Sequence, residues 1–392
     1  MGRRSSAVNV ILAAGGTGGH MVPAHALAAE LKKRGHGVAL VTDERGARIP
    51  GLFDGIPIHI LPAGRLGGGP LGWIRAALSI ASGRGQAKRL YRVFPPEVVV
   101  GFGGYPALPA LLGASARNIP TILHEQNAVL GRVNRFLAGE AAAIATAYAE
   151  VERLKPAHKA KTVLVGNPVR EAVARLGEAP LPPFDELAPL KILVTGGSQG
   201  ASVLGKVVPE GLGKLEPSLR RRLQIVQQCR PDDIENVRAR YAELGIPAEL
   251  STYIADMPAK LADCHLVIAR AGASTIAELT AAGRPAILIP LPSATDDHQT
   301  VNAREMAKAG GARMIAQPDF TADALAAQIA ALAGDPEALA NAAARALSIG
   351  KPHATSDLAD LVERIGGGLA PVAVGLSPRA APAFAGAGVA VR

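Results

Sequence analysis

Cysteine is scarce in this chain of 392 residues, which contains only Cys229 and Cys264. The two cysteines lie far apart in the sequence and in none of the spacings that bind zinc. The sequence therefore predicts neither a disulfide framework nor a structural metal site. Isolated cysteines of this kind are typical of proteins in a reducing compartment.

Long hydrophobic runs are also missing. No uncharged apolar stretch reaches the roughly 20 residues that a membrane-spanning helix requires. The apolar run at 8–14 is too short for a secretory signal, and we expect it to be a β-strand. Any contact with a membrane should then be peripheral.

Aromatic residues make up only 3% of the sequence, although basic residues outnumber acidic ones by 42 to 33. The resulting charge of +9 favours an anionic partner, such as a nucleic acid, a phosphorylated substrate or an acidic lipid surface. Proteins that bind nucleic acids usually place stacking aromatics among their basic residues. Because that combination is missing, we expect no nucleic-acid partner.

Short β-branched runs alternate with helical stretches along the whole chain. The runs lie at 8–14, 38–42, 56–61, 98–100, 121–123, 191–195, 223–227, 266–269, 286–290 and 312–315. Alternation of strand and helix predicts parallel sheets. We predict an α/β chain with two Rossmann-like, doubly wound sheets, whose ligands bind in the cleft between the carboxyl ends of the strands.

The expected domains follow from breaks in this pattern. We predict a first domain at 1–168, a second domain at 169–350, and a helix at 351–365 that packs back on the first domain. A Pro-rich stretch at 178–190 looks like a linker. The segment 366–392 is rich in Gly, Ala, Pro and Val and contains no acidic residue, so we expect a disordered tail.

A glycine-rich loop follows the first expected strand. It consists of Gly15, Gly16, Thr17, Gly18, Gly19 and His20. Glycines let the backbone approach a phosphate closely, and the following helix contributes free N–H donors and a partial positive charge. The loop therefore predicts a diphosphate site. A dinucleotide site is the alternative, supported by Asp43 at the end of the second strand but weakened by Met21, which occupies the place of the third glycine.

Two further glycine-rich loops follow expected strands. One contains Gly103, Gly104 and Tyr105, and the other contains Gly196, Gly197, Ser198, Gln199 and Gly200. Three such loops at corresponding strand ends favour a nucleotide diphosphate on one side of the cleft and a phosphorylated acceptor on the other.

The segment after the strand at 266–269 carries another set of candidate residues. We expect a helix to begin near Ser274, which would cap it, with the amides of Ala273, Ser274 and Thr275 facing the cleft. Glu278, one turn further on, would then bind ribose hydroxyls. The alternative is that Glu278 belongs only to a capping pair.

No Asp-x-Asp pair occurs in the sequence, so we expect no metal and no cofactor. The charge of a leaving diphosphate would instead be stabilised by helix dipoles and by Arg170 and Arg270. The alternative for either arginine is an ordinary surface ion pair.

Eight motifs together resemble one family. They are GGTGGH at 15–20, GGYPALPA at 103–110, HEQN at 124–127, GNPVR at 166–170, VTGGSQGA at 194–201, YIADM at 253–257, RAGASTIAEL at 270–279 and DDHQTVNA at 296–303. In this order and spacing they resemble the MurG family, the undecaprenyldiphospho-muramoylpentapeptide β-N-acetylglucosaminyltransferases with the two-domain GT-B fold. The resemblance covers most of the chain.

The resemblance implies an inverting transfer in peptidoglycan synthesis. The 4-hydroxyl of the muramyl residue of lipid I would attack UDP-N-acetylglucosamine, giving lipid II and UDP. The implied contacts with the sugar nucleotide are Thr17, Gly18, Gly19, Asn127, Arg170, Ser198, Ile254, Ala273, Ser274, Thr275, Ile276, Ala277, Glu278 and Gln299. Within this set Ile254 would clamp uracil, while Asn127 and Gln299 would read the sugar.

Direct displacement needs a base near the acceptor hydroxyl, and imidazole titrates in the useful range. His20 lies beside the first glycine loop and is our candidate, with Glu125 and His124 as rivals. A helix-capping or sugar-binding histidine is the alternative role for His20.

The stretch at 64–92 combines apolar residues with a basic fringe: Trp73, Ile74, Leu78, Ile80, Arg75, Arg84, Lys88, Arg89 and Arg92. This composition favours binding to an anionic lipid leaflet. The alternative is an ordinary domain helix with a solvated basic face, which would have the same sequence pattern. With the lipid acceptor that the resemblance implies, we expect peripheral attachment at the cytoplasmic face of the inner membrane, among other proteins of cell-wall synthesis.

Three other functions stay open. A UDP-sugar 2-epimerase would share the fold and turn over its sugar nucleotide without a lipid acceptor. An oxidoreductase would bind NAD through the first glycine loop. A non-catalytic sensor or scaffold would bind a UDP-sugar tightly and transfer nothing.

Overall fold

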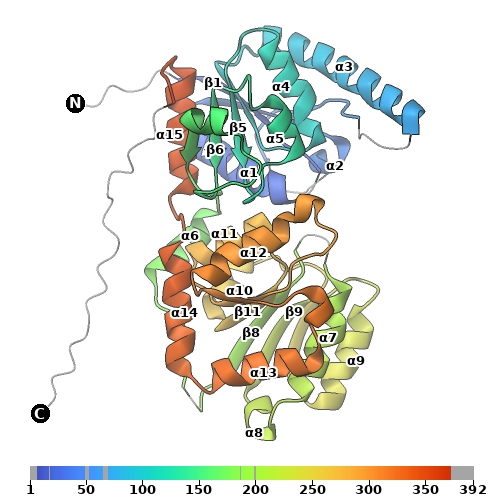
Figure 1. Cartoon of the computed structure of the whole chain (residues 1–392), viewed down its shortest axis with the longest axis vertical. Helices are drawn as coiled ribbons and strands as arrows, with labels where there is room; N and C mark the ends of the chain where they lie inside the picture. The colour runs from blue at the N-terminus through green and yellow to red at the C-terminus, as the bar shows by residue number, and fades with distance from the viewer. Residues whose placement is uncertain are drawn as a thin grey trace, which may run out of the picture.

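The structure is a computed structural model that describes residues 7–16, 18–48, 53–64, 69–185, 187–197 and 200–371. Within these residues the chain forms two lobes, each built on a parallel β-sheet flanked by helices (Figure 1). The part of the expected tail beyond 371 lies outside the described residues.

The N-terminal lobe contains a seven-stranded sheet among its described residues, in the order β3-β2-β1-β4-β5-β6-β7. All neighbouring strands in it are parallel. The strands are β1 (Asn9–Ala13), β2 (Gly37–Thr42), β3 (Ile58–Ile60), β4 (Val98–Gly101), β5 (Thr121–Glu125), β6 (Ala143–Thr146) and β7 (Thr162–Leu164). The α-helices of this part are α1 (Gly18–Lys33), α2 (Glu44–Ala47), α3 (Gly69–Val93), α4 (Leu108–Ser115) and α5 (Arg132–Leu137).

The C-terminal lobe repeats this plan with six strands among its described residues, in the order β10-β9-β8-β11-β12-β13. Its strands are β8 (Leu190–Thr195), β9 (Leu223–Gln228), β10 (Ala248–Ser251), β11 (Leu266–Ala269), β12 (Ala286–Leu288) and β13 (Ala312–Met314). The helices that follow the first lobe are α6 (Glu171–Ala174), α7 (Ser202–Gly213), α8 (Pro217–Arg220), α9 (Ile234–Leu244), α10 (Met257–Asp263), α11 (Ala273–Ala281), α12 (His298–Lys308), α13 (Ala322–Ala333), α14 (Pro336–Ser348) and α15 (Ala354–Gly366).

Three strands escaped the sequence-based prediction, namely β6, β7 and β10. The segments AIAT, TVL and AELS are only three or four residues long, too short for a strand pattern to stand out in the sequence. Each joins its sheet by parallel pairing with a neighbour that was predicted or lies next to one. Tertiary pairing, not local propensity, makes these segments strands.

Both sheets reverse their strand order at equivalent places, between β1 and β4 in the first and between β8 and β11 in the second. In open parallel sheets the crevice at the carboxyl ends of two such strands is the usual place for a ligand. The first two glycine loops follow β1 and β4, and the third follows β8. The segment that begins at Arg270 follows β11. At each reversal point, both of the two strands are therefore followed by one of the predicted binding segments.

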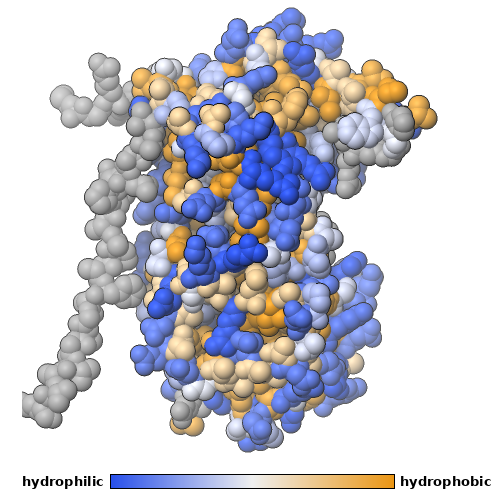
Figure 2. All heavy atoms as spheres, viewed as in Figure 1, coloured by the Kyte–Doolittle hydropathy of each residue, from blue (hydrophilic) through white to orange (hydrophobic). Residues whose placement is uncertain are grey.

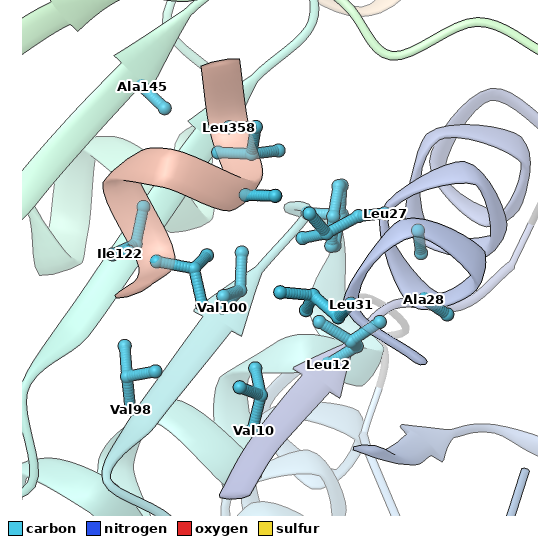
Figure 3. Packing of buried hydrophobic residues seen from close by; sticks show 14 of the residues in the cluster. Val10, Leu12, Leu27, Ala28, Leu31, Val98, Val100, Ile122, Ala145 and Leu358 are labelled. Atoms are coloured by element: carbon cyan, nitrogen blue, oxygen red, sulfur yellow. The ribbon is translucent and has the colours of Figure 1, made fainter. Parts of the chain in front are cut away.

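Helix α15 brings the chain back from the second lobe to the first (Figure 1), where it contacts α1. Figure 3 shows Leu358 of α15 packed in one cluster with Val10, Val100 and Leu27. Polar contacts flank this core, because Arg34 pairs with Asp360 and Glu363. The helix thus closes the first lobe while the chain before it belongs to the second.

Truncation of Leu358 tests this packing. Because its side chain is 0% exposed, Leu358→Ala should lower the free energy of unfolding by about 2–5 kcal/mol through lost burial and a residual cavity. The matched control is Leu369→Ala, which removes a side chain that is 57% exposed and should change stability by no more than about 0.5 kcal/mol. Equal midpoints in urea for both variants would contradict the role given to α15.

Candidate active site between the two sheets

The first glycine loop is held by Asp43, whose Oδ1 accepts hydrogen bonds from the amides of Gly16 and Gly46, each at 3.0 Å. Burial alone would raise the pKa of Asp43, but these two amides and the Arg45 guanidinium bring it below its ordinary value. A Cβ on Gly15 would lie 2.5 Å from Pro106, so the first two glycine loops pack against each other. Asp43 is therefore committed to the loop, which leaves it unavailable for a dinucleotide ribose.

The last three residues of this glycine-rich segment, Gly18, Gly19 and His20, form the start of helix α1. Their early position leaves backbone N–H groups without helical partners, as the predicted diphosphate site requires. Thr17 lies outside the described residues. Helix α1 also contacts α11 of the second lobe, and His20 in its first turn lines a cavity together with residues of that lobe.

The second loop needs glycine for its backbone. Gly103 and Gly104 have φ values of 83° and 73°, in the left-handed region, and Gly104 caps the short 3-10 helix Tyr105–Ala107. A Cβ on Gly104 would lie 3.5 Å from His20 Nε2. The loop therefore places a bare stretch of backbone beside the imidazole.

A cavity of about 210 Å³ lies between these loops and the second lobe. It is lined by both lobes: His20, Gly103, Gly104, Tyr105, Glu125, Gln126, Asn127, Val129, Leu130, Gly131, Arg132, Val133, Asn134, Thr295, Asp296 and His298. A larger cavity of about 400 Å³ lies near the amino ends of β8, β9 and β10. The larger cavity is lined by none of the residues of the predicted binding segments at the reversal points of the sheets. We therefore place the site in the cavity of about 210 Å³.

Glu125 is buried at the wall of this cavity and its carboxylate accepts four hydrogen bonds. Oε1 accepts from the amide and the side chain of Asn127, at 3.1 and 3.2 Å. Oε2 accepts from the Gly131 amide at 2.7 Å and from Asn134 Nδ2 at 2.8 Å. With these donors in place, the carboxylate organises the loop after β5, and its role as a base stays a prediction.

His20 contacts Gln126, whose Oε1 lies 3.1 Å from His20 Nδ1. Burial lowers the pKa of His20 below its ordinary value, while Glu125 and Gln126 act in the opposite direction and His298 adds to the lowering. At neutral pH the imidazole is consequently uncharged and able to accept a proton.

His124, the other rival base, is 0% exposed, and its Nε2 lies 3.0 Å from the carbonyl oxygen of Gly166. Burial lowers the pKa of His124 to about 4. Because it is enclosed and bonded on both ring nitrogens, His124 belongs to the framework behind His20.

The second lobe presents the first turn of α11 to the junction. The helix begins at Ala273 with Gly272 as its N-cap residue and has no side-chain cap. The expectation that Ser274 caps the helix was wrong, because Ser274 already lies inside the first turn and its Oγ, among the described residues, has no hydrogen-bond partner. The amides of Ala273, Ser274 and Thr275 are first-turn amides, as the predicted phosphate site requires.

Arg170 and Glu278 form an ion pair, with 2.8 Å between Arg170 Nη2 and Glu278 Oε1. Burial raises the pKa of Glu278 above its ordinary value, although Arg170 lowers it. Both residues were predicted to bind the nucleotide, and the structure brings them together from α11 and from the start of α6. Without a ligand, the two side chains neutralise each other's charge.

Arg270 has protein partners in this structure, and its predicted contact with a diphosphate stays a prediction. Its guanidinium donates to the carbonyls of Ile289 and Pro290, each at 3.1 Å, and to Gln317 Oε1 at 2.6 Å. The side chain is buried and supports the loop after β12, so it does not point a free guanidinium at a diphosphate.

Other predicted contacts also have structural partners. Gln299 Oε1 accepts from the amides of Ala271 and Leu291, which leaves its NH₂ group for a sugar. Ile254 and Ile276 lie in the hydrophobic core, and Ala277 follows Ile276 on α11. Ser198 and Gln199 lie outside the described residues.

Sequence reasoning missed the residues that join the two lobes. Asn302 donates to Asn127 Oδ1 at 3.1 Å and accepts from the Ala128 amide at 2.8 Å. Asp296 meets the guanidinium groups of three arginines of the first lobe, Arg132, Arg135 and Arg153. Both residues stand in the DDHQTVNA motif, but its spacing does not reveal that their partners lie more than 140 residues earlier.

Among the described residues, no group of three or more His, Cys, Asp and Glu side chains is arranged to hold a metal ion. The arrangement combines first-turn amides of two helices, a neutral imidazole and a cavity lined by two Rossmann-like lobes. This is the GT-B architecture, the fold class of many sugar-nucleotide transferases.

The comparisons with known proteins agree with this class. Residues 10–146 match the glycosyltransferase family 28 N-terminal domain, and residues 191–365 match the family 28 C-terminal domain. A relative from Erythrobacter litoralis (strain HTCC2594) is 63% identical over 91% of this chain and 90% of its own length. It is named UDP-N-acetylglucosamine--N-acetylmuramyl-(pentapeptide) pyrophosphoryl-undecaprenol N-acetylglucosamine transferase. The chain belongs to glycosyltransferase family 28.

Further similarities cover the same length. A relative from Zymomonas mobilis with the same name is 62% identical over 92% of this chain and 93% of its own. The solved structure of MurG from Acinetobacter baumannii is 31% identical, with a TM-score of 0.73 over 91% of this chain and 99% of that one. A UDP-GlcNAc 2-epimerase from Neisseria meningitidis, solved with UDP-GlcNAc, has a TM-score of 0.61 but is only 13% identical over 90% of this chain and 98% of that one, so it shows the fold alone.

Replacement of Glu125 by Gln tests its organising role. The NH₂ group of the new glutamine would face two of the N–H donors that the Glu125 carboxylate now accepts from. We expect the free energy of unfolding to fall by about 3 kcal/mol, because charge-assisted hydrogen bonds are lost in a buried site. Glu150→Gln, at an exposed position, is the control and should be neutral. Chemical denaturation measures both, and an unchanged midpoint for Glu125→Gln would show that the four bonds do not hold the loop.

Proposed function

We propose that this chain transfers N-acetylglucosamine from UDP-N-acetylglucosamine to the 4-hydroxyl of the muramyl residue of lipid I, giving lipid II and UDP. The observation that carries the proposal is the cavity in which a neutral His20 faces the glycine loop at Gly103 and Gly104, opposite the second lobe. Relatives that are 62–63% identical over nearly the whole chain carry the name of this reaction.

The donor is assigned to the second lobe. The first-turn amides of α11 and the adjacent Arg170 supply donors and positive charge for the diphosphate. Glu278 would exchange its contact with Arg170 for the ribose hydroxyls, which frees the guanidinium for the phosphates. Ile254 is buried, so its contact with uracil would come largely from the main chain. Ser198 stays a predicted contact of the diphosphate, and Thr17 stays a predicted contact of the sugar nucleotide.

The acceptor is assigned to the cavity. The backbone of Gly103 and Gly104, with Tyr105 beside it, lines the cavity and suits the diphosphate of the lipid carrier. Gly15 and Gly16, also predicted on the acceptor side, belong to the loop that packs against Pro106. Asn134 adds an unsatisfied acceptor, because its buried Oδ1, among the described residues, has no hydrogen-bond partner. We assign it to a hydroxyl of the muramyl sugar.

The chemistry is a single displacement. His20 Nε2 takes the proton of the 4-hydroxyl while its oxygen forms a bond to the anomeric carbon. The bond between the anomeric carbon and the phosphate oxygen breaks, and its electron pair leaves with UDP. Attack from the face opposite the leaving group inverts the anomeric configuration. The helix end and Arg170 stabilise the charge that develops on UDP.

A 2-epimerase is disfavoured by the same observations. Such an enzyme needs no second phosphorylated substrate, so it gives no reason for the two packed glycine loops at the acceptor cavity. The likeness to the solved epimerase rests on fold and carries no residue assignment.

We also propose that α3 attaches the protein to the anionic cytoplasmic face of the inner membrane. Ala76, Ala87 and Tyr91 of this helix are buried, and the helix packs on α4. Figure 2 shows hydrophobic atoms gathered where α3 projects from the first lobe. The exposed apolar residues there are Leu71, Trp73, Ile74 and Leu78, with the exposed Arg75, Arg84, Arg89 and Arg92 along the same helix.

This combination suits an interfacial helix, whose apolar side chains enter the headgroup region while its arginines meet anionic lipids. Among the described helices, none has the length and apolar character needed to cross a bilayer.

Replacement of His20 tests the chemistry. In the transfer of labelled N-acetylglucosamine to a short-chain lipid I analogue, His20→Ala should lower kcat by about 10²–10⁴-fold, the usual contribution of a general base, and leave the KM for UDP-N-acetylglucosamine nearly unchanged. The surface variant His158→Ala is the control. For the wild type, kcat/KM should fall as the pH drops through the pKa of His20, below the ordinary value of 6.5, because protonation removes the base. Wild-type turnover in His20→Ala would remove it from this role.

The membrane proposal is tested by co-sedimentation with vesicles of phosphatidylglycerol and phosphatidylcholine. Ile74→Ser combined with Leu78→Ser should weaken binding about tenfold or more, since each buried side chain contributes on the order of 1.5 kcal/mol. Leu187→Ser is the matched control, because Leu187 is 90% exposed on the other lobe. Binding should also fall with salt and in purely zwitterionic vesicles. A double variant that binds like the control would exclude α3 as the anchor.

A further inference from the structure

The side-chain amide of Gln126 has only one workable orientation. Gln126 is 2% exposed, and its Nε2 lies 3.0 Å from the carbonyl oxygen of Phe102 and 3.1 Å from that of His124. Carbonyl oxygens only accept hydrogen bonds, so the NH₂ group must face them. The flipped amide would bring Oε1 against two other oxygens with no proton between them, which is costly in a buried site.

This orientation decides where His20 carries its proton. Gln126 Oε1 is turned towards His20 Nδ1, at 3.1 Å, and an amide oxygen can only accept. Nδ1 must therefore hold the proton and donate it. In the neutral imidazole the lone pair is then on Nε2, the nitrogen that lies 3.5 Å from the Cβ position of Gly104 in the cavity.

His124 supports the same arrangement from behind. Its Nε2 lies 3.0 Å from the carbonyl of Gly166, so this nitrogen carries the proton and donates. His124 Nδ1 is left as an acceptor and lies 2.9 Å from Gln126 Nε2. The two hydrogens of the Gln126 NH₂ group thus face three acceptors, all of which agree with the same orientation of the amide.

We propose that Gln126 and His124 are positioning residues that hold His20 in the tautomer with the proton on Nδ1, so that Nε2 is the atom that accepts the proton of the attacking hydroxyl. The part of this inference that names Nε2 as the base rests on the proposed function. The tautomer itself is a property of the protein without substrate and is measured separately.

The tautomer is read by NMR on the full chain with ¹⁵N-labelled histidine, without substrate, because two-bond ¹H–¹⁵N correlations show which ring nitrogen carries the proton. The His20 signals are identified by their loss in His20→Ala. Measurement well above the pKa of His20 keeps the ring neutral, and the charged or titratable groups acting on it are Glu125, His298 and His124. We expect the Nδ1–H form in the wild type.

Two variants of Gln126 separate positioning from a general structural role. Gln126→Leu removes the acceptor, so His20 should lose the pure Nδ1–H form and kcat should fall about tenfold or more, with the KM for UDP-N-acetylglucosamine nearly unchanged. Gln126→Glu keeps an oxygen opposite Nδ1, and the O–H of its protonated carboxyl group can face the carbonyl oxygens of Phe102 and His124, so the Nδ1–H tautomer and part of kcat should return. Gln224→Leu, at an exposed position of β9, is the control, and thermal melting shows that each variant is folded.

A wild-type His20 with its proton on Nε2 would overturn the inference without any variant. So would an unchanged Nδ1–H form in folded Gln126→Leu. If the tautomers follow the expected pattern but the wild type transfers no sugar, the proposed function fails and the positioning by Gln126 stands, because the NMR measurement involves no substrate.

Discussion

The site depends on one constraint, that the reversal points of two parallel sheets face each other across a single cleft. Each sheet delivers its loops to its own carboxyl edge, and neither edge alone contains both a helix end for the donor and a base for the acceptor. The contacts between the lobes therefore matter as much as either fold. Asn302 connects α12 to the loop after β5, while Asp296 meets three arginines of the first lobe.

Most of the buried polar side chains near His20 hold loop backbone and histidine rings in place. Glu125 binds three donors of the loop after β5 and one of α5, Asp43 binds the first glycine loop, and His124 is bonded at both nitrogens. A buried network of this kind is stable only when its groups are satisfied. His20 differs, since its Nε2 edge is directed to the cavity while its Nδ1 edge is held by Gln126.

The sequence predicts the strands with strong β-branched patterns and the glycine loops that follow them, because both signals are local. The rule that ligands bind at the carboxyl ends of parallel strands also predicts that His20, Gly103 and Asn127 lie together, and all three line the same cavity. The sequence does not predict the carbonyl partners of Arg270, since a guanidinium after a strand looks the same in sequence whether it faces a phosphate or a neighbouring loop. Gln126 and Asn134 were missed as site residues for a related reason: their roles come from contacts that only the folded loop creates.

The most direct measurement is a crystal structure of the chain with UDP-N-acetylglucosamine bound. The uridine diphosphate should lie against the first turn of α11, with Glu278 on the ribose. The anomeric carbon should then be about 6 Å from His20 Nε2, the sum of one hydrogen bond and one near-attack separation. A nucleotide bound instead through the loop at Gly15 and Gly16, or an anomeric carbon directed away from His20, would contradict a shared cleft in which donor and acceptor meet.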